Sequence, residues 1–150
     1  MQLLADYDEK VAEVGAEVTE ANGGEAPTIS MLRFMSGKIR LYGNYSFIGV
    51  ILNDAGLPRP EIEDIEELQT EITAEEITKA TGDWLLWGTY GDPAATDQDA
   101  VVDGPLWGEV PAVKAGSIVE EVPDDIWYLG LGTLGADLVL DQLSEIAAAA

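Results

Sequence analysis

The sequence predicts an α/β domain in which a mainly parallel sheet lies between two layers of helices, as in a three-layer Rossmann-like lobe. Segments with the features of strands alternate with segments of helical spacing, which is typical of layered α/β domains. The apolar run DWLLWGTY at residues 83–90 lies between two glycines and indicates a strand buried on both faces. The 150 residues, 47% of them hydrophobic, are enough for one domain with its own core.

Residues 3–21 have the spacing of an amphipathic helix. Val11, Val14 and Val18 fall near one face, acidic residues cover the others, and glycines follow at residues 23 and 24. The apolar stripe is thin. It therefore predicts a helix that lies on the surface or packs against a part of the molecule outside this chain.

A strand, a turn and a capped helix are predicted next. Residues 28–34 have the composition of a strand, Ser36-Gly37-Lys38 reads as a turn, and residues 39–41 form a short extended piece. Ser46 is placed to cap a helix that runs to Ala55. Gly56 suits the position just after that helix, where a left-handed backbone is common.

The second half of the chain continues the alternation. Residues 58–71 predict an acidic loop with a short strand near Leu68, and Thr73 with Glu76 forms a capping box that opens a helix to Ala80. The remaining segments are a polar, acidic excursion at 93–104, a helical turn at 106–110, a strand at 117–122 and a closing helix at 133–147.

Composition excludes several classes of function. The net charge is −22, from 29 acidic and 7 basic residues, which disfavours binding to nucleic acid. The chain has neither cysteine nor histidine, which disfavours a transition-metal site on the protein itself. Its carboxylates lie in acidic runs, not isolated among apolar residues, so no catalytic residue and no enzyme activity are predicted. No secretory signal or membrane-spanning run is apparent.

The charge is distributed unevenly. Residues 26–53 contain no Asp or Glu, although they hold Arg33, Lys38 and Arg40, three of the seven basic residues. A core strand and a buried helix would explain the missing acids, but they would not explain three clustered cations. The window therefore favours a locally positive, ligand-binding surface.

One edge of the predicted sheet is the expected ligand site. In open α/β sheets, ligands bind outside the carboxyl ends of the strands, and a helix N-terminus at that edge favours an anion or a polarised oxygen. Aromatic walls with a few strong donors suit a bulky, oxygen-rich ligand. The side chains expected at this edge are Arg33, Tyr42, Asn44, Tyr45, Tyr90, Trp127 and Tyr128.

Three stretches of sequence resemble a known family. They are GPLWGEVPAVKAG at 104–116, RLYGNYSF at 40–47 and DAGLPRP at 54–60. Together with the IWY run at 126–128, they resemble the C-terminal part of substrate-binding proteins that serve ABC importers for ferric siderophores, haem and cobalamin. The resemblance is strongest to ferric hydroxamate-type, class III periplasmic-binding proteins, and covers nearly the whole chain from about residue 27.

The resemblance implies a domain plan and a function. Residues 1–24 would be a helical segment from the connection between two lobes, and residues 25–150 the C-terminal ligand-binding lobe, with the N-terminal lobe missing. The protein would be extracytoplasmic and would deliver a ferric siderophore to an ABC permease. The iron would be carried inside the siderophore, with no cofactor bound directly. A haem- or cobalamin-type ligand, or an acidic protein-interaction domain without a small ligand, remains an alternative.

The resemblance also implies roles for particular residues. Trp127 and Tyr128 match an aromatic pair that lines the cleft in hydroxamate-binding relatives, residues 42–47 match a ligand-contacting loop, and Arg33 matches a position shared by siderophore-binding members. Residues 63–73, EDIEELQTEIT, lack the aromatic that some relatives carry, so the ligand class stays open. Glu75 matches the acidic residue that meets an arginine of the permease.

Overall fold

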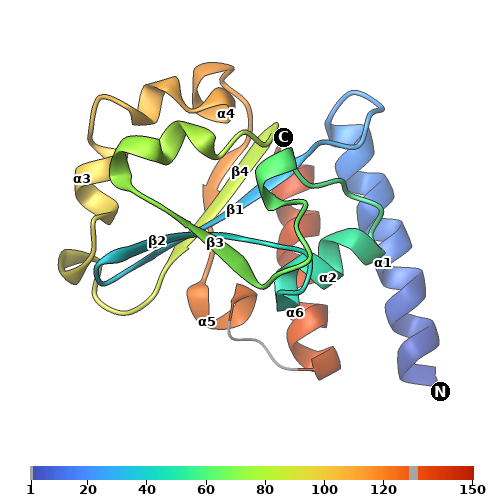
Figure 1. Cartoon of the computed structure of the whole chain (residues 1–150). Coiled ribbons are helices and arrows are strands. Elements are labelled where there is room, and N and C mark those ends of the chain that lie inside the picture. Colours follow the sequence, from blue (N-terminus) through green and yellow to red (C-terminus); the bar gives the residue numbers. More distant parts are fainter. Residues whose placement is uncertain (1, 129–131) are drawn as a thin grey trace.

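The structure, a computed structural model, describes residues 2–128 and 132–150. Its centre is a five-stranded sheet in the order β3-β2-β1-β4-β5 (Figure 1). The strands are β1 (Ile29–Met35), β2 (Lys38–Tyr42), β3 (Gln69–Ile72), β4 (Trp84–Thr89) and β5 (Val119–Glu121). The predicted α/β fold, with a central sheet flanked by helices, is confirmed.

The sheet has a parallel half and an antiparallel half. β1 pairs in parallel with β4, and β4 with β5, whereas β2 is antiparallel to both β1 and β3. The antiparallel half follows from the tight turn between β1 and β2, where Gly37 has a φ of 71° that other residues rarely adopt. The expected parallel core is therefore present, and β2 and β3 add two antiparallel pairs beyond it, with α2 and η1 between them in the chain.

Helices cover both faces of this sheet, as Figure 1 shows. On one face, α1, α2 and α6 pack on a core that includes Met31, Trp84 and Leu86. On the other face, short helices cover a second core, built on Leu32 and Phe34. The α-helices are α1 (Gln2–Ala21), α2 (Phe47–Asp54), α3 (Gln98–Val102), α4 (Pro111–Lys114), α5 (Asp124–Trp127) and α6 (Gly132–Ala148). The 3-10 helices are η1 (Glu61–Glu63), η2 (Ala74–Lys79), η3 (Pro93–Ala95) and η4 (Trp107–Glu109).

Helix α1 is part of the core, contrary to the expectation of a surface helix or one packed outside this chain. Val11, Val14 and Val18 are buried in the same cluster as residues of α2 and α6. A Cβ on Gly15 would lie 2.1 Å from the carbonyl oxygen of Ala55, so α1 can reach the end of α2 only because this residue has no side chain. A few apolar side chains are sufficient to hold α1 in the core, because its backbone at Gly15 packs closely against the end of α2 and adds to the contact.

The predicted helix caps are confirmed. The hydroxyl of Ser46 accepts a hydrogen bond from the backbone N–H of Gly49 at 3.0 Å, and Gly56 follows α2 with a φ of 74°. Thr73 and Glu76 form the predicted capping box at the start of η2. The acidic excursion at 93–104, by contrast, contains helix α3, whose buried Val101 anchors it to the second core.

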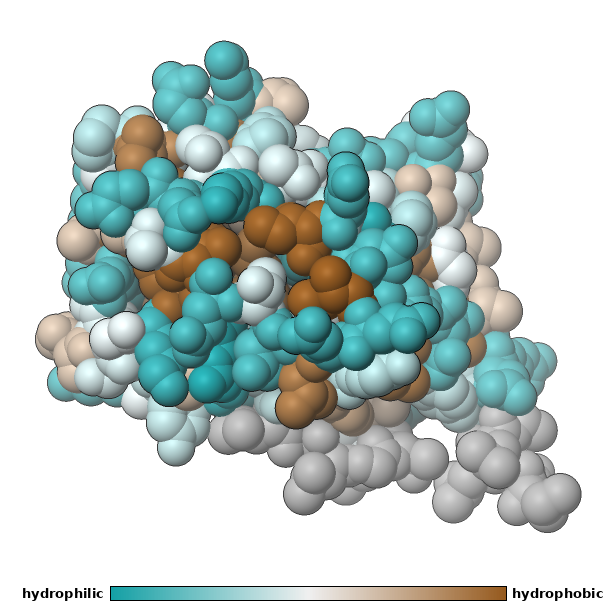
Figure 2. Space-filling model, viewed as in Figure 1, coloured by the Kyte–Doolittle hydropathy of each residue, from teal (hydrophilic) through white to brown (hydrophobic). Residues whose placement is uncertain are grey.

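The face seen in Figure 2 is largely hydrophilic, with a patch of apolar residues near its centre. None of the helices in the described parts of the chain is both long and apolar enough to span a bilayer. Most acidic residues in the described parts of the chain are exposed or partly exposed. Glu63, however, is fully buried.

Candidate ligand-binding site

Arg33 is the centre of a polar cluster on the face of the sheet that carries α1, α2 and α6. Its Nε and one terminal nitrogen donate to the two carboxylate oxygens of Asp124, at 2.7 and 2.8 Å. Its other terminal nitrogen donates to the hydroxyl of Tyr42 at 3.0 Å. Asp124 lies in the first turn of α5, so this forked pair fastens α5 to the middle of the sheet.

Three tyrosine rings surround the guanidinium. The carbon at its centre lies 4.8 Å from the ring centroid of Tyr90, 5.3 Å from that of Tyr128 and 6.0 Å from that of Tyr42. Such distances allow cation–π attraction. A Cβ on Gly88 would lie 2.8 Å from the ring of Tyr128, so the glycine in β4 makes room for that ring. The ring of Tyr90 is half exposed and covers the cluster on its outer side.

A hollow of about 210 Å³ opens beside this cluster. It combines a cation, phenolic hydroxyls and the capped N-terminus of α2 with apolar walls. A mixed lining of this kind suits an oxygen-rich ligand with apolar parts. The lining residues are Arg33, Tyr42, Ser46, Phe47, Ile48, Leu68, Gln69 and Tyr128.

The Arg33 guanidinium stays protonated. Burial alone would lower the pKa of the Arg33 guanidinium, but its hydrogen bonds to Asp124 and Tyr42 raise that pKa above its ordinary value. Burial, together with neighbouring acidic groups, also raises the pKa of the Tyr128 phenol, whose hydroxyl donates to the carbonyl oxygen of Leu32 at 2.6 Å. Both groups therefore keep their protons at neutral pH, and neither offers a base for catalysis.

A second buried ion pair supports the site from behind. Arg59 donates to the carboxylate of Glu63 at 3.0 Å and to the backbone carbonyl of Tyr42 at 2.5 Å. Oε1 of Glu63 also accepts from the backbone N–H of Met31 at 2.7 Å. The pair thus connects the segment after α2 to β1 and β2. On β2 it holds the backbone of Tyr42, whose hydroxyl accepts from Arg33.

The structure brings together four of the seven predicted ligand-contact residues. Arg33, Tyr42, Tyr90 and Tyr128 form the cluster described above, and three of them line the hollow. Arg33 and Tyr90 lie near the carboxyl ends of the parallel strands β1 and β4, as the sequence predicted. Tyr42 ends β2, which runs antiparallel to β1, and Tyr128 ends α5, so these two reach Arg33 by packing on the face of the sheet.

The other three predicted residues are not part of the cluster. The Asn44 amide donates to Asp64 at 2.8 Å and accepts from Asn53, so it fastens a loop to α2. Tyr45 is 60% exposed and does not line the hollow. Trp127, contrary to the expectation that it faces the cleft, is fully buried in the core, where its indole N–H donates to Gln142 of α6. Because consecutive helical residues point in different directions, Tyr128 turns to the sheet and Trp127 to α6.

Sequence reasoning missed several residues that build the site. Asp124 stands in an acidic stretch with no feature that marks it as the partner of Arg33. Arg59 and Glu63 fall in the segment 58–71, which was interpreted as an acidic loop. The i,i+4 spacing of an arginine and a glutamate among prolines was the one signal that indicated a pair.

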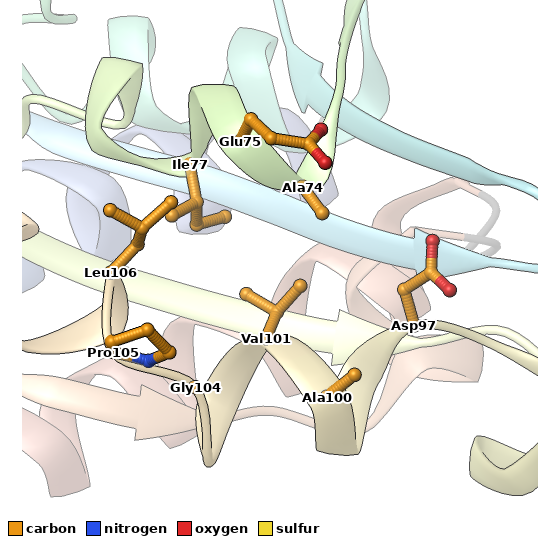
Figure 3. Close-up of a pocket in the computed structure, with 9 residues that line it drawn as sticks. All are labelled: Ala74, Glu75, Ile77, Asp97, Ala100, Val101, Gly104, Pro105 and Leu106. Atoms are coloured by element: carbon orange, nitrogen blue, oxygen red, sulfur yellow. The ribbon is translucent and has the colours of Figure 1, made fainter.

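Glu75 lies at a separate hollow of about 360 Å³ on the opposite face of the sheet (Figure 3). Its carboxylate projects from η2, and that of Asp97 projects from the start of α3. Between these segments lie the apolar side chains of Ile77, Val101 and Leu106. Glu75 is exposed and is not the capping residue, so it is available to a partner.

Within residues 2–128 and 132–150, no three carboxylates or other candidate ligands are grouped closely enough to hold a metal ion. The site chemistry instead combines one buried cation, three phenols and a small hollow. It suits recognition of a preformed ligand by hydrogen bonds and ring contacts.

Curated proteins with related sequences have names that concern siderophores. The probable siderophore-binding lipoprotein YfiY of Bacillus subtilis (strain 168) is 29% identical over 153 residues, which cover 95% of this chain and 46% of that protein. The achromobactin-binding periplasmic protein of Dickeya dadantii (strain 3937) is 23% identical over 150 residues, 97% of this chain and 49% of that protein. The chain therefore spans about half the length of these relatives.

Solved structures show the same fold. SirA of Staphylococcus aureus complexed with staphyloferrin B gives a TM-score of 0.85 at 21% identity, over 98% of this chain and 54% of that one. The FhuD protein from S. pseudintermedius gives 0.83 at 21% identity, over 99% and 53%. The family described as "Periplasmic binding protein" matches residues 1–123. This match covers most of the 150 residues, and the chain belongs to that family of periplasmic binding proteins.

Proposed function

We propose that this chain is the C-terminal lobe of an extracytoplasmic protein that captures a ferric siderophore and delivers it to an ABC permease. The observation that carries the proposal is the Arg33 cluster with its three tyrosines, set beside a hollow of mixed polar and apolar lining. The names of the two curated relatives and of SirA with staphyloferrin B support siderophores as the ligand class.

The chemistry of such a ligand matches the site. A siderophore encloses its iron with its own oxygens, so the protein has only to recognise the outer surface of the complex. Arg33 and the hydroxyls of Tyr42 and Tyr90 supply donors to those oxygens, and the rings supply apolar contact. Tyr90 is the most exposed member of the cluster and would be the first to meet the ligand. Trp127 has no part in the contact and instead anchors α5 in the core.

The proposal predicts that the chain alone binds ferric siderophores weakly, because one lobe supplies only part of a two-lobe cleft. Binding is measured by quenching of intrinsic fluorescence on titration with ferric staphyloferrin B. We expect at least a hundredfold tighter binding when the N-terminal half of the Bacillus subtilis relative is fused ahead of the chain. Tyr90→Ala in the fusion should weaken binding about tenfold. If neither protein binds, the siderophore function is wrong; if the chain alone binds as tightly as the fusion, the two-lobe arrangement is wrong.

Glu75 is proposed as a docking residue for the permease. Its place on the face of the sheet opposite Arg33 predicts that Glu75→Ala leaves the siderophore dissociation constant within twofold and lowers iron uptake at least fivefold. Uptake is measured in cells that depend on the full-length protein. Glu13→Ala, which removes an exposed acid from α1, is the matched control and should change neither quantity. A parallel loss of binding and uptake in Glu75→Ala would show that it has no separate docking role.

A further inference from the structure

Arg40 lies directly opposite Arg33 on the neighbouring strand, and the two side chains share one face of the sheet. Arg33 of β1 and Arg40 of β2 are paired in the antiparallel register, and paired residues of antiparallel strands point to the same side. Tyr42, two residues further along β2, points to that side as well and lines the hollow. Like charges at directly opposite positions destabilise a sheet. An arrangement of this kind requires a counter-charge.

The two arginines are neutralised to very different degrees. Arg33 has a forked pair with Asp124 at 2.7 and 2.8 Å. Among the described residues, Arg40 is paired only with Glu71, and the 3.8 Å between its Nε and Oε1 of Glu71 is too long for a hydrogen bond. The side chain of Glu71 is 57% exposed, and its Oε1 also lies 3.9 Å from Nζ of Lys38, so the two cations share one carboxylate oxygen.

One donor of Arg40 is left without a partner. Its Nε is buried and has no hydrogen-bond partner among the described residues. An unsatisfied buried donor is costly, and an unsatisfied group in a native structure requires an explanation. The Arg40 side chain is 20% exposed, and a rotation of it toward the surface would allow a ligand carboxylate to accept from Nε and to relieve the repulsion between the two guanidinium groups.

We propose that Arg40 forms an anion subsite beside the hollow and selects ferric complexes that carry free carboxylates over complexes of no net charge. This inference rests on the proposed siderophore function and specifies the class of ligand. The rest of the molecule supports it, because a chain of net charge −22 repels an anionic ligand everywhere except at a local excess of cations. At this surface, Arg33, Lys38 and Arg40 face Asp124 and Glu71, so three cations meet two acids and one positive charge is in excess.

The test compares an anionic and a neutral complex on the same chain. Gallium(III) replaces iron so that nuclear magnetic resonance can follow the side-chain Nε–H signals of the ¹⁵N-labelled protein at millimolar ligand. The probes are gallium dicitrate, an anionic complex in which citrate carboxylates remain uncoordinated, and gallium ferrichrome, whose three hydroxamates cancel the metal charge. We expect the anionic complex to shift the Nε–H signals of Arg40 and Arg33 and to bind at least tenfold more tightly than the neutral one. Added salt should reduce this difference.

Variants in β2 assign the effect to Arg40. Arg40→Gln should weaken binding of the anionic complex about tenfold and leave the neutral complex unchanged. Arg40→Lys, which keeps the charge and loses the planar fork, should give an intermediate result and serves as the second variant if Arg40→Gln does not fold. Lys38→Gln removes an equal charge from the same strand at a more exposed position, and should change binding less than twofold.

Each outcome decides between the two proposals. If both complexes bind equally and Arg40→Gln has no effect, the anion subsite is wrong and the siderophore function stands. If neither complex shifts any signal of the chain or of the two-lobe fusion at millimolar concentration, both proposals are overturned. If Arg40→Gln and Lys38→Gln weaken binding equally, the effect comes from the general charge of the surface, and Arg40 is not the selecting residue.

Discussion

Replacing Arg33 with methionine is expected to lower the free energy of unfolding by about 3–5 kcal/mol, because the change leaves the carboxylate of Asp124 without its counter-ion. Both side chains are largely shielded, with exposed fractions of 6% for Arg33 and 11% for Asp124. A charge left alone in such a place keeps the cost of losing water and has no attraction to offset it. Urea denaturation, followed by tryptophan fluorescence, measures the change.

Two comparisons separate this effect from a general loss of charge. The double variant Arg33→Met, Asp124→Leu should recover most of the stability, since no unpaired charge remains. Lys114→Met breaks an exposed pair with Glu109 and should cost about 0–1 kcal/mol. A loss below 1 kcal/mol for Arg33→Met would show that water reaches Asp124 and that the cluster is not shielded.

The stability of the protein should fall as the pH rises from about 4.5 to about 7 because of Glu63. Burial raises the pKa of this carboxyl from 4.5 to about 7, and the attraction of Arg59 only partly opposes the shift. Between these values the folded form holds a proton that the unfolded form releases, so rising pH favours unfolding. Above about 7 both forms are ionised and the full cost is present. At about 1.4 kcal/mol per pKa unit, the loss is on the order of 3 kcal/mol.

Glu63→Gln isolates this contribution, because glutamine keeps the shape of the side chain and cannot ionise. Many surface acids also titrate, so the informative quantity is the unfolding free energy of the wild type minus that of Glu63→Gln, measured from pH 5 to pH 8. This difference should decrease with rising pH. A difference that increases with pH would show that the attraction of Arg59 outweighs the burial of Glu63, and that the pKa is depressed. Parallel curves would show that the two effects cancel.

The meeting of Arg33 with Tyr90 could be predicted because it depends on topology: β1 and β4 are parallel, and their carboxyl ends lie at one edge of the sheet. Tyr42 ends the antiparallel strand β2 and Tyr128 ends α5, so their contacts with Arg33 depend on pairing and packing that the edge rule does not contain. The caps of α2 and η2 were equally predictable, since each depends on residues within four positions of one another.

Other parts of the site depend on contacts that no local pattern contains. Arg33 and Asp124 are 91 positions apart, and several acids in the same region would have served equally well on sequence grounds. The orientation of Trp127 follows from the single helical turn of α5, whose rotation is set by packing against α6. The antiparallel direction of β2 was also missed. The sequence predicted the tight turn between β1 and β2, and such a turn joins strands that run in opposite directions, but the sheet was expected to be mainly parallel.

The β1–β2 hairpin has a consequence for the order of assembly. Its contacts are local, and hairpins close within microseconds, whereas the neutralising carboxylate of Asp124 arrives from far along the chain. Until α5 docks, the two arginines repel each other in a nascent hairpin that has no internal means of cancelling their charge. We expect anions in the surrounding medium to act as temporary counter-ions at this stage, so that the folding speed of the domain depends on its ionic surroundings even where its final stability does not.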